Sequence, residues 1–362
     1  MESIDKFTAL TARIEAGERI SEAEALTLAG APPALLGDLA VKAKECKSGR
    51  EVYYNRNFHV EPTNICVFDC EFCSYRRPAG SPEAWDYSAE EIVEQVRARK
   101  NSGATEVHIT GGVHPAHDLQ YYAGLIKAIK REMPGVAVKA FSAVELFYMI
   151  QKAGLPLKEG LRILQEAGMD SVPGGGAEIF APEIRNKICP EKCTAGEWLA
   201  LHEEAHSLGL RSNATMLYGH IETWEHRIDH LARLRELQER TGGFSAFIPL
   251  KYRNRHNRMS DAGEVGIVED MRVLAISRIF LDNFPHVKTY WAMYGRDTAE
   301  MALAFGADDV DGTIDDSTKI YSMAGAEENA PAMTAAAMER LIKNGGYEPV
   351  ERDTFYNPVK KH

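Results

Sequence analysis

The stretch FHVEPTNICVFDCEFCSY, residues 58–75, joins a short strand-like segment to a loop that holds three cysteines. Its first part is one of eight short apolar or β-branched segments spread along the chain. Short runs of this kind between turn residues are typical of buried strands. The eight predicted strands span residues 59–62, 104–110, 136–142, 169–173, 211–217, 244–249, 287–291 and 309–312.

Segments with helical spacing separate the predicted strands. Ser88 and Glu91 form a capping-box pattern at the start of one such segment, and Thr194 and Glu197 form another. Because each crossover helix must cover the sheet, this alternation predicts parallel strands. A count of eight fits an α/β fold of the (β/α)8 TIM-type barrel class, and an open doubly wound sheet is the alternative.

Helix-like segments flank the predicted barrel on both sides. Residues 1–51 precede the first strand and predict a helical N-terminal cap. Residues 52–320 predict the barrel core. Residues 321–362 predict a C-terminal helix and a tail that pack on the barrel.

The composition is that of a compactly folded chain with an acidic balance. The 362 residues are 44% hydrophobic and 26% charged, with a formal net charge of −11. This charge disfavours nucleic acid and anionic membranes as partners. No segment resembles a secretory signal or a membrane-spanning helix, so we expect a cytoplasmic protein.

Three of the six cysteines, Cys66, Cys70 and Cys73, lie directly after the first predicted strand. In a parallel barrel this position is at the carboxyl end of the strands, where active sites form. Three thiolates can bind three irons of a [4Fe–4S] cluster and leave one iron open to another ligand. Structural zinc is the alternative, although it needs four ligands. The other three cysteines are expected to pack as small apolar side chains.

The pattern Cys66-x3-Cys70-x-Phe72-Cys73 resembles the signature loop of the radical S-adenosylmethionine (SAM) superfamily. The resemblance implies that the three cysteines bind a [4Fe–4S] cluster, that Phe72 contacts the cofactor, and that the amino and carboxylate groups of SAM chelate the open iron. It also implies reductive cleavage of SAM to methionine and a 5′-deoxyadenosyl radical. The electron is then expected from a low-potential donor such as flavodoxin or ferredoxin.

A second element follows the second predicted strand. Thr110, Gly111 and Gly112 are similar to the Gly-Gly-Glu element that receives the methionine amino group in this superfamily. Val113 replaces the acid, so the resemblance implies that backbone carbonyls make the contact. Two glycines after a strand are also ordinary turn residues.

Three further positions are implied to contact SAM. Ser142 and Glu145 could polarise this ligand, or they could form a capping box, and both readings stay open here. Glu178 follows the glycine run 174–176 and is implied to bind the ribose hydroxyls. Gly219 belongs to a segment similar to the superfamily's element near the adenine, although the first glycine of that element is absent.

Longer segments resemble one branch of the superfamily, the enzymes of the futalosine route to menaquinone and the tyrosine-using subunit of deazaflavin (F0) synthase. The resemblance implies a small aromatic substrate with two carboxylates, 3-[(1-carboxyvinyl)oxy]benzoate, to which the adenosyl group of SAM is added. A sibling cyclase that abstracts hydrogen, the F0 synthase subunit and a non-catalytic zinc or electron-transfer protein remain alternatives. The segments span residues 64–75, 110–115, 170–180, 213–223, 242–254 and 311–325.

Two carboxylates in a dry cavity require paired donors, because an uncompensated buried charge is costly. Lys251, at the end of the sixth predicted strand, is the first candidate, and His114, after the second strand, is another. His114 is also a candidate to carry a proton. Arg253 and Arg296 are further candidates. For each cation the alternative is a solvated surface position.

Overall fold

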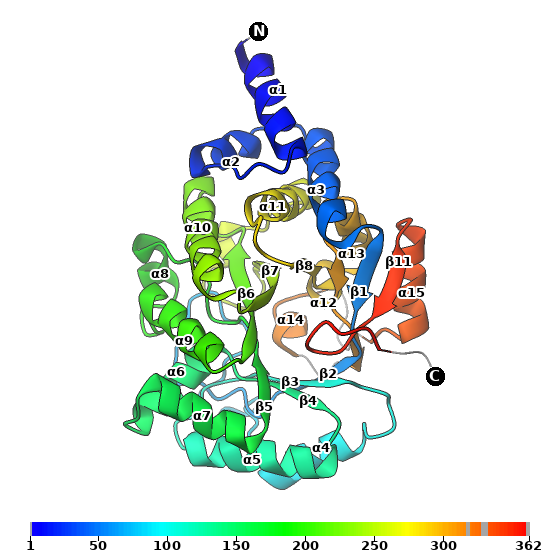
Figure 1. Ribbon diagram of the computed structural model, residues 1–362. Helices are drawn as coiled ribbons and strands as arrows, with labels where there is room; N and C mark the ends of the chain where they lie inside the picture. The colour runs from blue at the N-terminus through cyan, green and yellow to red at the C-terminus, as the bar shows by residue number, and fades with distance from the viewer. Residues whose placement is uncertain (1, 316–318, 327–331, 360–362) are drawn as a thin grey trace.

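The computed structural model describes residues 2–315, 319–326 and 332–359 of the chain. Within these residues, eleven strands form one curved, all-parallel sheet in the order β10-β2-β3-β4-β5-β6-β7-β8-β9-β1-β11 (Figure 1). The strands are β1 (Glu51–Tyr54), β2 (Asn57–Val60), β3 (Glu106–Ile109), β4 (Ala137–Ala140), β5 (Met169–Val172), β6 (Arg211–Tyr218), β7 (Phe244–Lys251), β8 (His286–Thr289), β9 (Asp309–Val310), β10 (Thr313–Asp315) and β11 (Glu348–Glu351).

Two pairs of short strands bring the ends of the sheet together. β9 pairs with β1, and β10 pairs with β2. Because β1 and β2 follow each other along the chain, as do β9 and β10, residues 309–315 run beside residues 51–58. A break separates the two pairs where Gly312 meets Asn55. A Cβ on Gly312 would lie 1.1 Å from the Asn55 carbonyl oxygen, so only glycine permits this approach.

The predicted barrel is confirmed, because each of the eight predicted segments overlaps one of the strands β2 to β9. The open doubly wound sheet is therefore the wrong alternative. β1, β10 and β11 were not predicted. They extend the ring of eight strands where its first and last members meet.

Helices cover the outside of the sheet, and several begin at caps that the sequence predicts. The side chains of Ser88 and Thr194 accept hydrogen bonds from the backbone N–H three residues on, in complete capping boxes. The helices are α1 (Glu2–Glu15), α2 (Glu22–Ala29), α3 (Pro33–Ser48), α4 (Ala89–Arg97), α5 (Leu119–Glu132), α6 (Ala143–Lys152), α7 (Leu157–Ala167), α8 (Pro182–Ile188), α9 (Ala195–Ser207), α10 (Trp224–Thr241), α11 (Ile267–Phe280), α12 (Trp291–Tyr294), α13 (Arg296–Leu303), α14 (Lys319–Met323) and α15 (Ala335–Asn344), with a 3-10 turn η1 (Ser260–Ala262).

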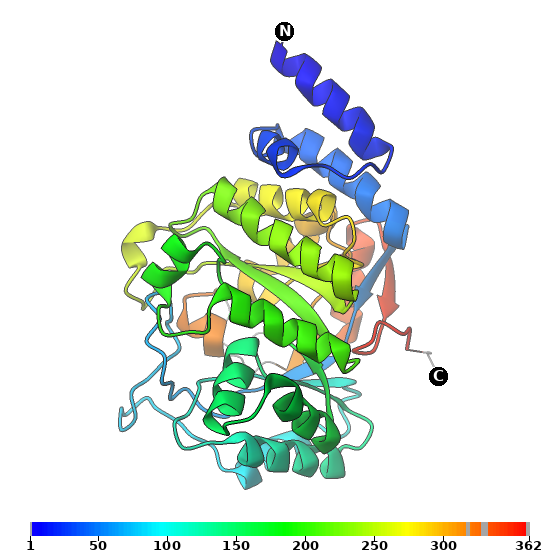
Figure 2. The same ribbon diagram turned by 60° about the vertical axis from the view of Figure 1, so that its left-hand side comes forward.

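The first three helices stand together at one end of the molecule, and α1 extends furthest from the barrel (Figures 1 and 2). α3 packs along α11, and α2 packs against α10. Arg235 of α10 also donates to the carbonyl of Ile20, at 2.9 Å. These contacts attach the N-terminal helices to the outer layer of the barrel.

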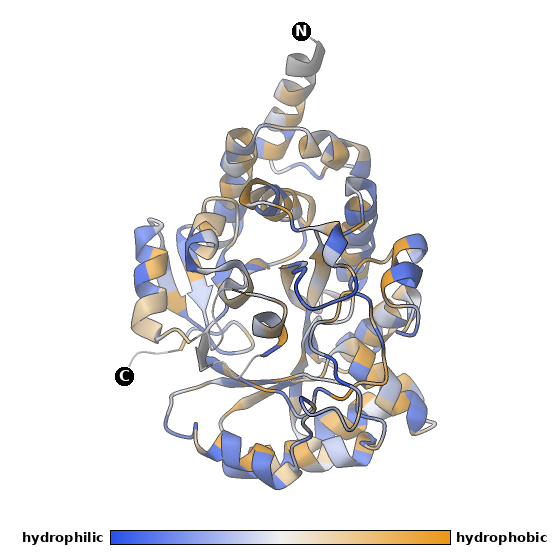
Figure 3. Cartoon of the chain, turned by 180° about the vertical axis from the view of Figure 1, so that it is seen from behind, coloured by the Kyte–Doolittle hydropathy of each residue, from blue (hydrophilic) through white to orange (hydrophobic). Residues whose placement is uncertain are grey.

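The core lies between the sheet and the outer helices. Leu231, Leu234 and Leu237 of α10 are buried at successive turns, and the outer helices carry both hydrophobic and hydrophilic residues (Figure 3). None of the described helices combines the length and the apolar character that crossing a membrane requires.

The C-terminal tail supplies partners for two buried carboxylates at the amino ends of the strands. β11 pairs with β1, and Arg352 then donates to Asp309 Oδ2 at 2.6 Å. Tyr356 also donates to Asp309, and Thr354 donates to Glu106. Residues 327–331 and 360–362 of the predicted C-terminal extension lie outside the described residues.

Replacing Arg352 with alanine tests this arrangement. We expect the variant to lose about 3 kcal/mol of unfolding free energy, because Asp309 would stay buried with a weaker cation, Lys288, at 3.7 Å. Urea denaturation measures the change. The matched control is Arg340→Ala on the exposed face of α15, for which we expect a change within about 0.5 kcal/mol. Equal midpoints for the two variants would contradict the assigned role of the tail.

Candidate active site

A cavity of about 310 Å³ lies at the carboxyl ends of the strands, the face where (β/α)8 barrels build their active sites. Loops that follow β2, β3, β4 and β5 form much of its wall, and inward-facing strand residues form its inner part. Gly219 and His114 do not line it. The predicted site residues that do are Cys66, Cys70, Phe72, Cys73, Thr110, Gly111, Gly112, Ser142, Glu145, Glu178 and Lys251.

The cysteine loop is held against the neighbouring loop by its backbone. The N–H of Val67 donates to the carbonyl of Val113 at 2.9 Å. The backbone N–H of Arg76 donates to Cys73 Sγ at 3.4 Å, and the Arg76 Nε donates to the carbonyl of Cys66 at 3.2 Å. These contacts fix both ends of the loop and provide one donor to a sulfur.

The chemistry of the three thiols fits an iron–sulfur cluster. Burial raises the pKa of Cys66 and raises that of Cys70 to about 12, so neither thiol ionises readily without a metal. Thiolates around one zinc ion lie about 3.8 Å apart. The three cysteines do not form a group of ligand atoms within 4.8 Å of one another, whereas a cubane binds each thiolate at a different iron. The donor set therefore fits the cluster better than a single ion.

Two glycines let the loop after β3 pass close to the cysteine loop. A Cβ on Gly111 would lie 2.8 Å from the carbonyl oxygen of Thr63, and one on Gly112 would lie 2.3 Å from that of Ile65. Both distances are shorter than any side chain tolerates. The glycines are thus required by the fold of the site, whatever further contact their backbone makes with a ligand.

Glu145 connects the loop after β3 to the start of α6. Its carboxylate accepts hydrogen bonds from Thr110 Oγ1 at 2.9 Å, the Gly111 N–H at 3.2 Å and the Ser142 N–H at 2.8 Å. Burial raises the pKa of Glu145 to about 7, although the hydrogen bonds from Ser142 and Thr110 act in the opposite direction. Ser142 and Glu145 therefore form the capping box at the start of α6, and Glu145 also lines the cavity.

Glu178 stands on the cavity wall in a conformation that is rare for a residue other than glycine. Its φ angle is 49°, and its Oε1 pairs with Lys192 Nζ at 2.6 Å. Lys192 also lies 5.0 Å from the ring centre of Phe72. The pair thus connects the glycine run after β5 to the cysteine loop.

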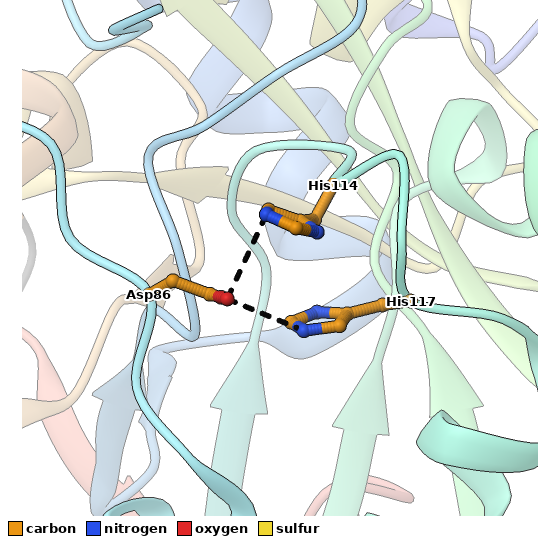
Figure 4. Close-up of side chains that lie close together, drawn as sticks. All are labelled: Asp86, His114 and His117. Carbon is orange, nitrogen blue, oxygen red and sulfur yellow. Dashed lines mark ion pairs between the residues drawn. The ribbon is translucent and has the colours of Figure 1, made fainter. Parts of the chain in front are cut away.

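His114 lies outside the cavity lining, in a cluster with Asp86 and His117 (Figure 4). Asp86 Oδ2 is 3.6 Å from His114 Nε2 and 3.4 Å from His117 Nε2. The Nδ1 of His114 accepts a hydrogen bond from the Ala116 N–H at 3.1 Å, and Nε2 is the nitrogen that faces Asp86. None of the three side chains lines the cavity, so this cluster is separate from the cysteine site.

The predicted cations differ in how far their charges are already paired. Lys251 Nζ pairs with Asp270 Oδ2 at 2.8 Å. Arg253 pairs with Glu264 Oε2 at 3.4 Å and donates to the Gly325 carbonyl, while its buried Nε has no hydrogen-bond partner among the described residues. Arg296 stacks over Trp291 and does not line the cavity.

The inner wall of the cavity contains polar residues that the sequence analysis did not select. They are His59, Glu106, His108, Lys139, Lys288 and Asp311. The sequence indicates three of them, His59, His108 and Lys139. Each is a polar residue between apolar ones in a strand, in NFHV, EVHI and AVKA. In a strand whose outer face is covered by helices, such a residue must point into the barrel.

Replacing Gly112 with alanine tests the close approach of the two loops. The added Cβ would displace the Ile65 carbonyl, next to Cys66, so we expect at least a twofold loss of iron and sulfide per chain after anaerobic reconstitution. Gly124→Ala in α5 is the control, because a Cβ there has no atom within 4 Å. Full iron content in the Gly112 variant would show that the loop tolerates the displacement.

Comparisons with known proteins agree with this geometry. Residues 60–234 match the family model of the radical SAM superfamily, and residues 241–362 match the CofH/MqnC C-terminal region. The chain resembles the solved structures of methylornithine synthase (TM-score 0.75, 16% identity, 94% of this chain and 97% of that one) and the FeFe-hydrogenase maturase HydG from Carboxydothermus hydrogenoformans (0.75, 17%, 97% and 81%). At such identities these likenesses show the fold alone.

Curated relatives are similar over almost the whole chain. An aminodeoxyfutalosine synthase from Thermus thermophilus is 43% identical, covering 96% of this chain and 94% of that protein, and one from Streptomyces coelicolor is 36% identical, covering 98% and 94%. A 5-amino-6-(D-ribitylamino)uracil–L-tyrosine 4-hydroxyphenyl transferase from Methanocaldococcus jannaschii is 38% identical, covering 85% and 88%. The chain therefore belongs to the radical SAM superfamily, in the branch that shares the CofH/MqnC C-terminal region.

Proposed function

We propose that the protein acts as an aminodeoxyfutalosine synthase, a radical SAM transferase of menaquinone biosynthesis that joins the adenosyl group of SAM to 3-[(1-carboxyvinyl)oxy]benzoate with rearrangement and loss of a carboxyl group. The observation that carries the proposal is the 43% identity to the Thermus synthase over nearly the full length of both chains. The cavity adds support, because it combines the three cysteines with basic side chains.

Cys66, Cys70 and Cys73 would hold a [4Fe–4S] cluster, and with SAM bound this group supplies a 5′-deoxyadenosyl radical. The chain itself must hold the substrate in place and keep water out. Phe68 and Phe72 stand on the cavity wall beside the cysteines and provide apolar surface there. We propose a low-potential flavodoxin or ferredoxin as the electron donor.

The SAM contacts are proposed from the residues that the structure gathers beside the cysteine loop. Thr110, Gly111 and Glu145 form one hydrogen-bonded unit, which would present backbone carbonyls to the amino group in place of the acid that Val113 replaces. Glu178, oriented by Lys192, would accept the ribose hydroxyls. Gly219 does not line the cavity, so its contact near the adenine stays a prediction.

At the mouth of the cavity, we propose that Arg253 binds a substrate carboxylate. Its Nε is buried without a hydrogen-bond partner, and a carboxylate would supply one. Lys251 also lines the cavity. Because its ammonium is already paired with Asp270, we propose that it contributes only a secondary attraction to the substrate carboxylate. The proposed role of His114 stays a prediction, since this residue lies beyond the cavity wall.

The tyrosine 4-hydroxyphenyl transferases give a second candidate function. Several proteins with this name are 34 to 38% identical to the chain. A sibling cyclase that abstracts hydrogen would use the same cluster. The substrates and the fate of the adenosyl group separate these activities.

Incubation of the reconstituted enzyme with SAM, a reductant and the enol ether benzoate tests the proposed activity. We expect mass spectrometry to show a product that contains the adenine of SAM, formed in step with methionine. A product without adenine, accompanied by equimolar 5′-deoxyadenosine, would support the cyclase. Turnover only with tyrosine and 5-amino-6-(D-ribitylamino)uracil would support the transferase.

Alanine replacements of Cys66, Cys70 and Cys73 test the cluster assignment. We expect each to lower the iron and sulfide content of the reconstituted chain and to abolish product formation, because three thiolates are the minimum that holds the cluster. Cys46→Ala, at an exposed cysteine of α3, is the matched control and should retain full iron content and activity. Undiminished turnover in the three site variants would refute the assignment.

A further inference from the structure

Three neighbouring strands place polar residues at the same level inside the barrel. His59 of β2 is the register partner of His108 of β3, which is in turn the partner of Lys139 of β4. All three line the cavity. The inward layers of such barrels are ordinarily filled by branched apolar side chains, and burying polar groups is costly. A polar layer at this depth therefore indicates a binding surface.

The charged groups around this layer are already paired. Lys139 Nζ lies 2.7 Å from Glu106 Oε2, and Lys288 Nζ lies 3.1 Å from Asp311 Oδ2. Burial alone would raise the pKa of Glu106, but Lys139 and Lys288 hold it well below its usual value. Glu106 is thus charged, and each lysine has a carboxylate partner.

The Nε2 of His108 is buried and has no hydrogen-bond partner among the described residues. Burial and the neighbouring His59 and Lys139 lower the pKa of His108 well below its usual value, so the ring is neutral. A neutral imidazole carries one N–H, which can donate to an anionic oxygen. Because His108 lines the cavity and the described part of the chain gives its Nε2 no partner, the ring can present an N–H to an anionic oxygen of a ligand.

A row of aromatic rings continues from His108 along the same wall. The ring centres of His59 and His108 are 4.6 Å apart, those of His59 and Tyr290 are 6.2 Å apart, and those of Tyr290 and Tyr321 are 5.1 Å apart. Rings tilted against one another at these distances provide both faces and edges that an aromatic ligand can contact.

We propose that His108 binds the ring carboxylate of the aromatic substrate at the inner end of the cavity. The proposal rests on the function proposed above. The vinyl carbon that reacts must lie at the cysteine end, and the ring carboxylate is the acidic group remote from it. That carboxylate therefore points inward, toward the N–H of His108. The vinyl carboxylate stays near Arg253.

Binding measurements on the reconstituted holoenzyme test this assignment. The variants are His108→Leu, which removes the donor, His108→Gln, which keeps an amide donor, and His226→Gln as a control on the outer helix α10. The probes are 3-[(1-carboxyvinyl)oxy]benzoate and two analogues, each lacking one carboxylate. Anaerobic titration calorimetry gives Kd, while thermal melting and cluster absorbance verify folding and loading.

For the full substrate we expect His108→Leu to raise Kd by roughly tenfold to a hundredfold, the effect of losing a hydrogen bond to a charged group. His108→Gln should recover part of this loss, and His226→Gln should bind as the unaltered enzyme does. The analogue without the ring carboxylate should bind the unaltered enzyme and His108→Leu equally. The analogue without the vinyl carboxylate should still show the loss.

Two results would overturn the inference in distinguishable ways. If His108→Leu weakened both analogues by the same factor, or weakened nothing, the ring carboxylate would not be the group that His108 binds, although the proposed function would stand. If the unaltered, cluster-loaded enzyme bound none of the three probes, the proposed function itself would fail.

Discussion

The pairing of residues 309–315 with residues 51–58 is the contact on which the site depends. Without it the parallel sheet would remain open, and the cysteine loop after β2 would face the last strands across solvent. With it, the loops after β2, β3, β4 and β5 surround one cavity. The requirement for glycine at position 312 follows from this contact, since any side chain there would collide with the Asn55 backbone.

The sequence predicts the ring of eight strands because alternating strands and capped helices leave few topologies, but it does not predict the strands at the seam. β11 contains Pro349 and two glutamates, a composition suited to the edge that it occupies and not to a central strand. β10 is too short to show periodicity, and only its pairing with β2 defines it.

The candidate site divides in the same way. The cysteine loop carries its chemistry in local spacing, so Cys66, Cys70 and Cys73 are recognisable from a few residues of sequence. The inner wall of the cavity is not recognisable in this way. A single histidine in a strand, such as His108, indicates a site only when the strand register places it beside His59 and Lys139. Helices must also cover the outer face of the sheet. Glu145 lies between these cases: its capping box is local, but its hydrogen bonds to the loop after β3 come from the fold.

The strand β11 joins two parts of the chain that are far apart in sequence. Residues 348–351 pair with residues 51–54, and Arg352 and Thr354 then reach the buried carboxylates Asp309 and Glu106. Segments separated by so much chain lose a large conformational entropy when they meet, so they pair stably only after the intervening strands have assembled. We therefore expect the joining of β11 to be a late step in the folding of the ring.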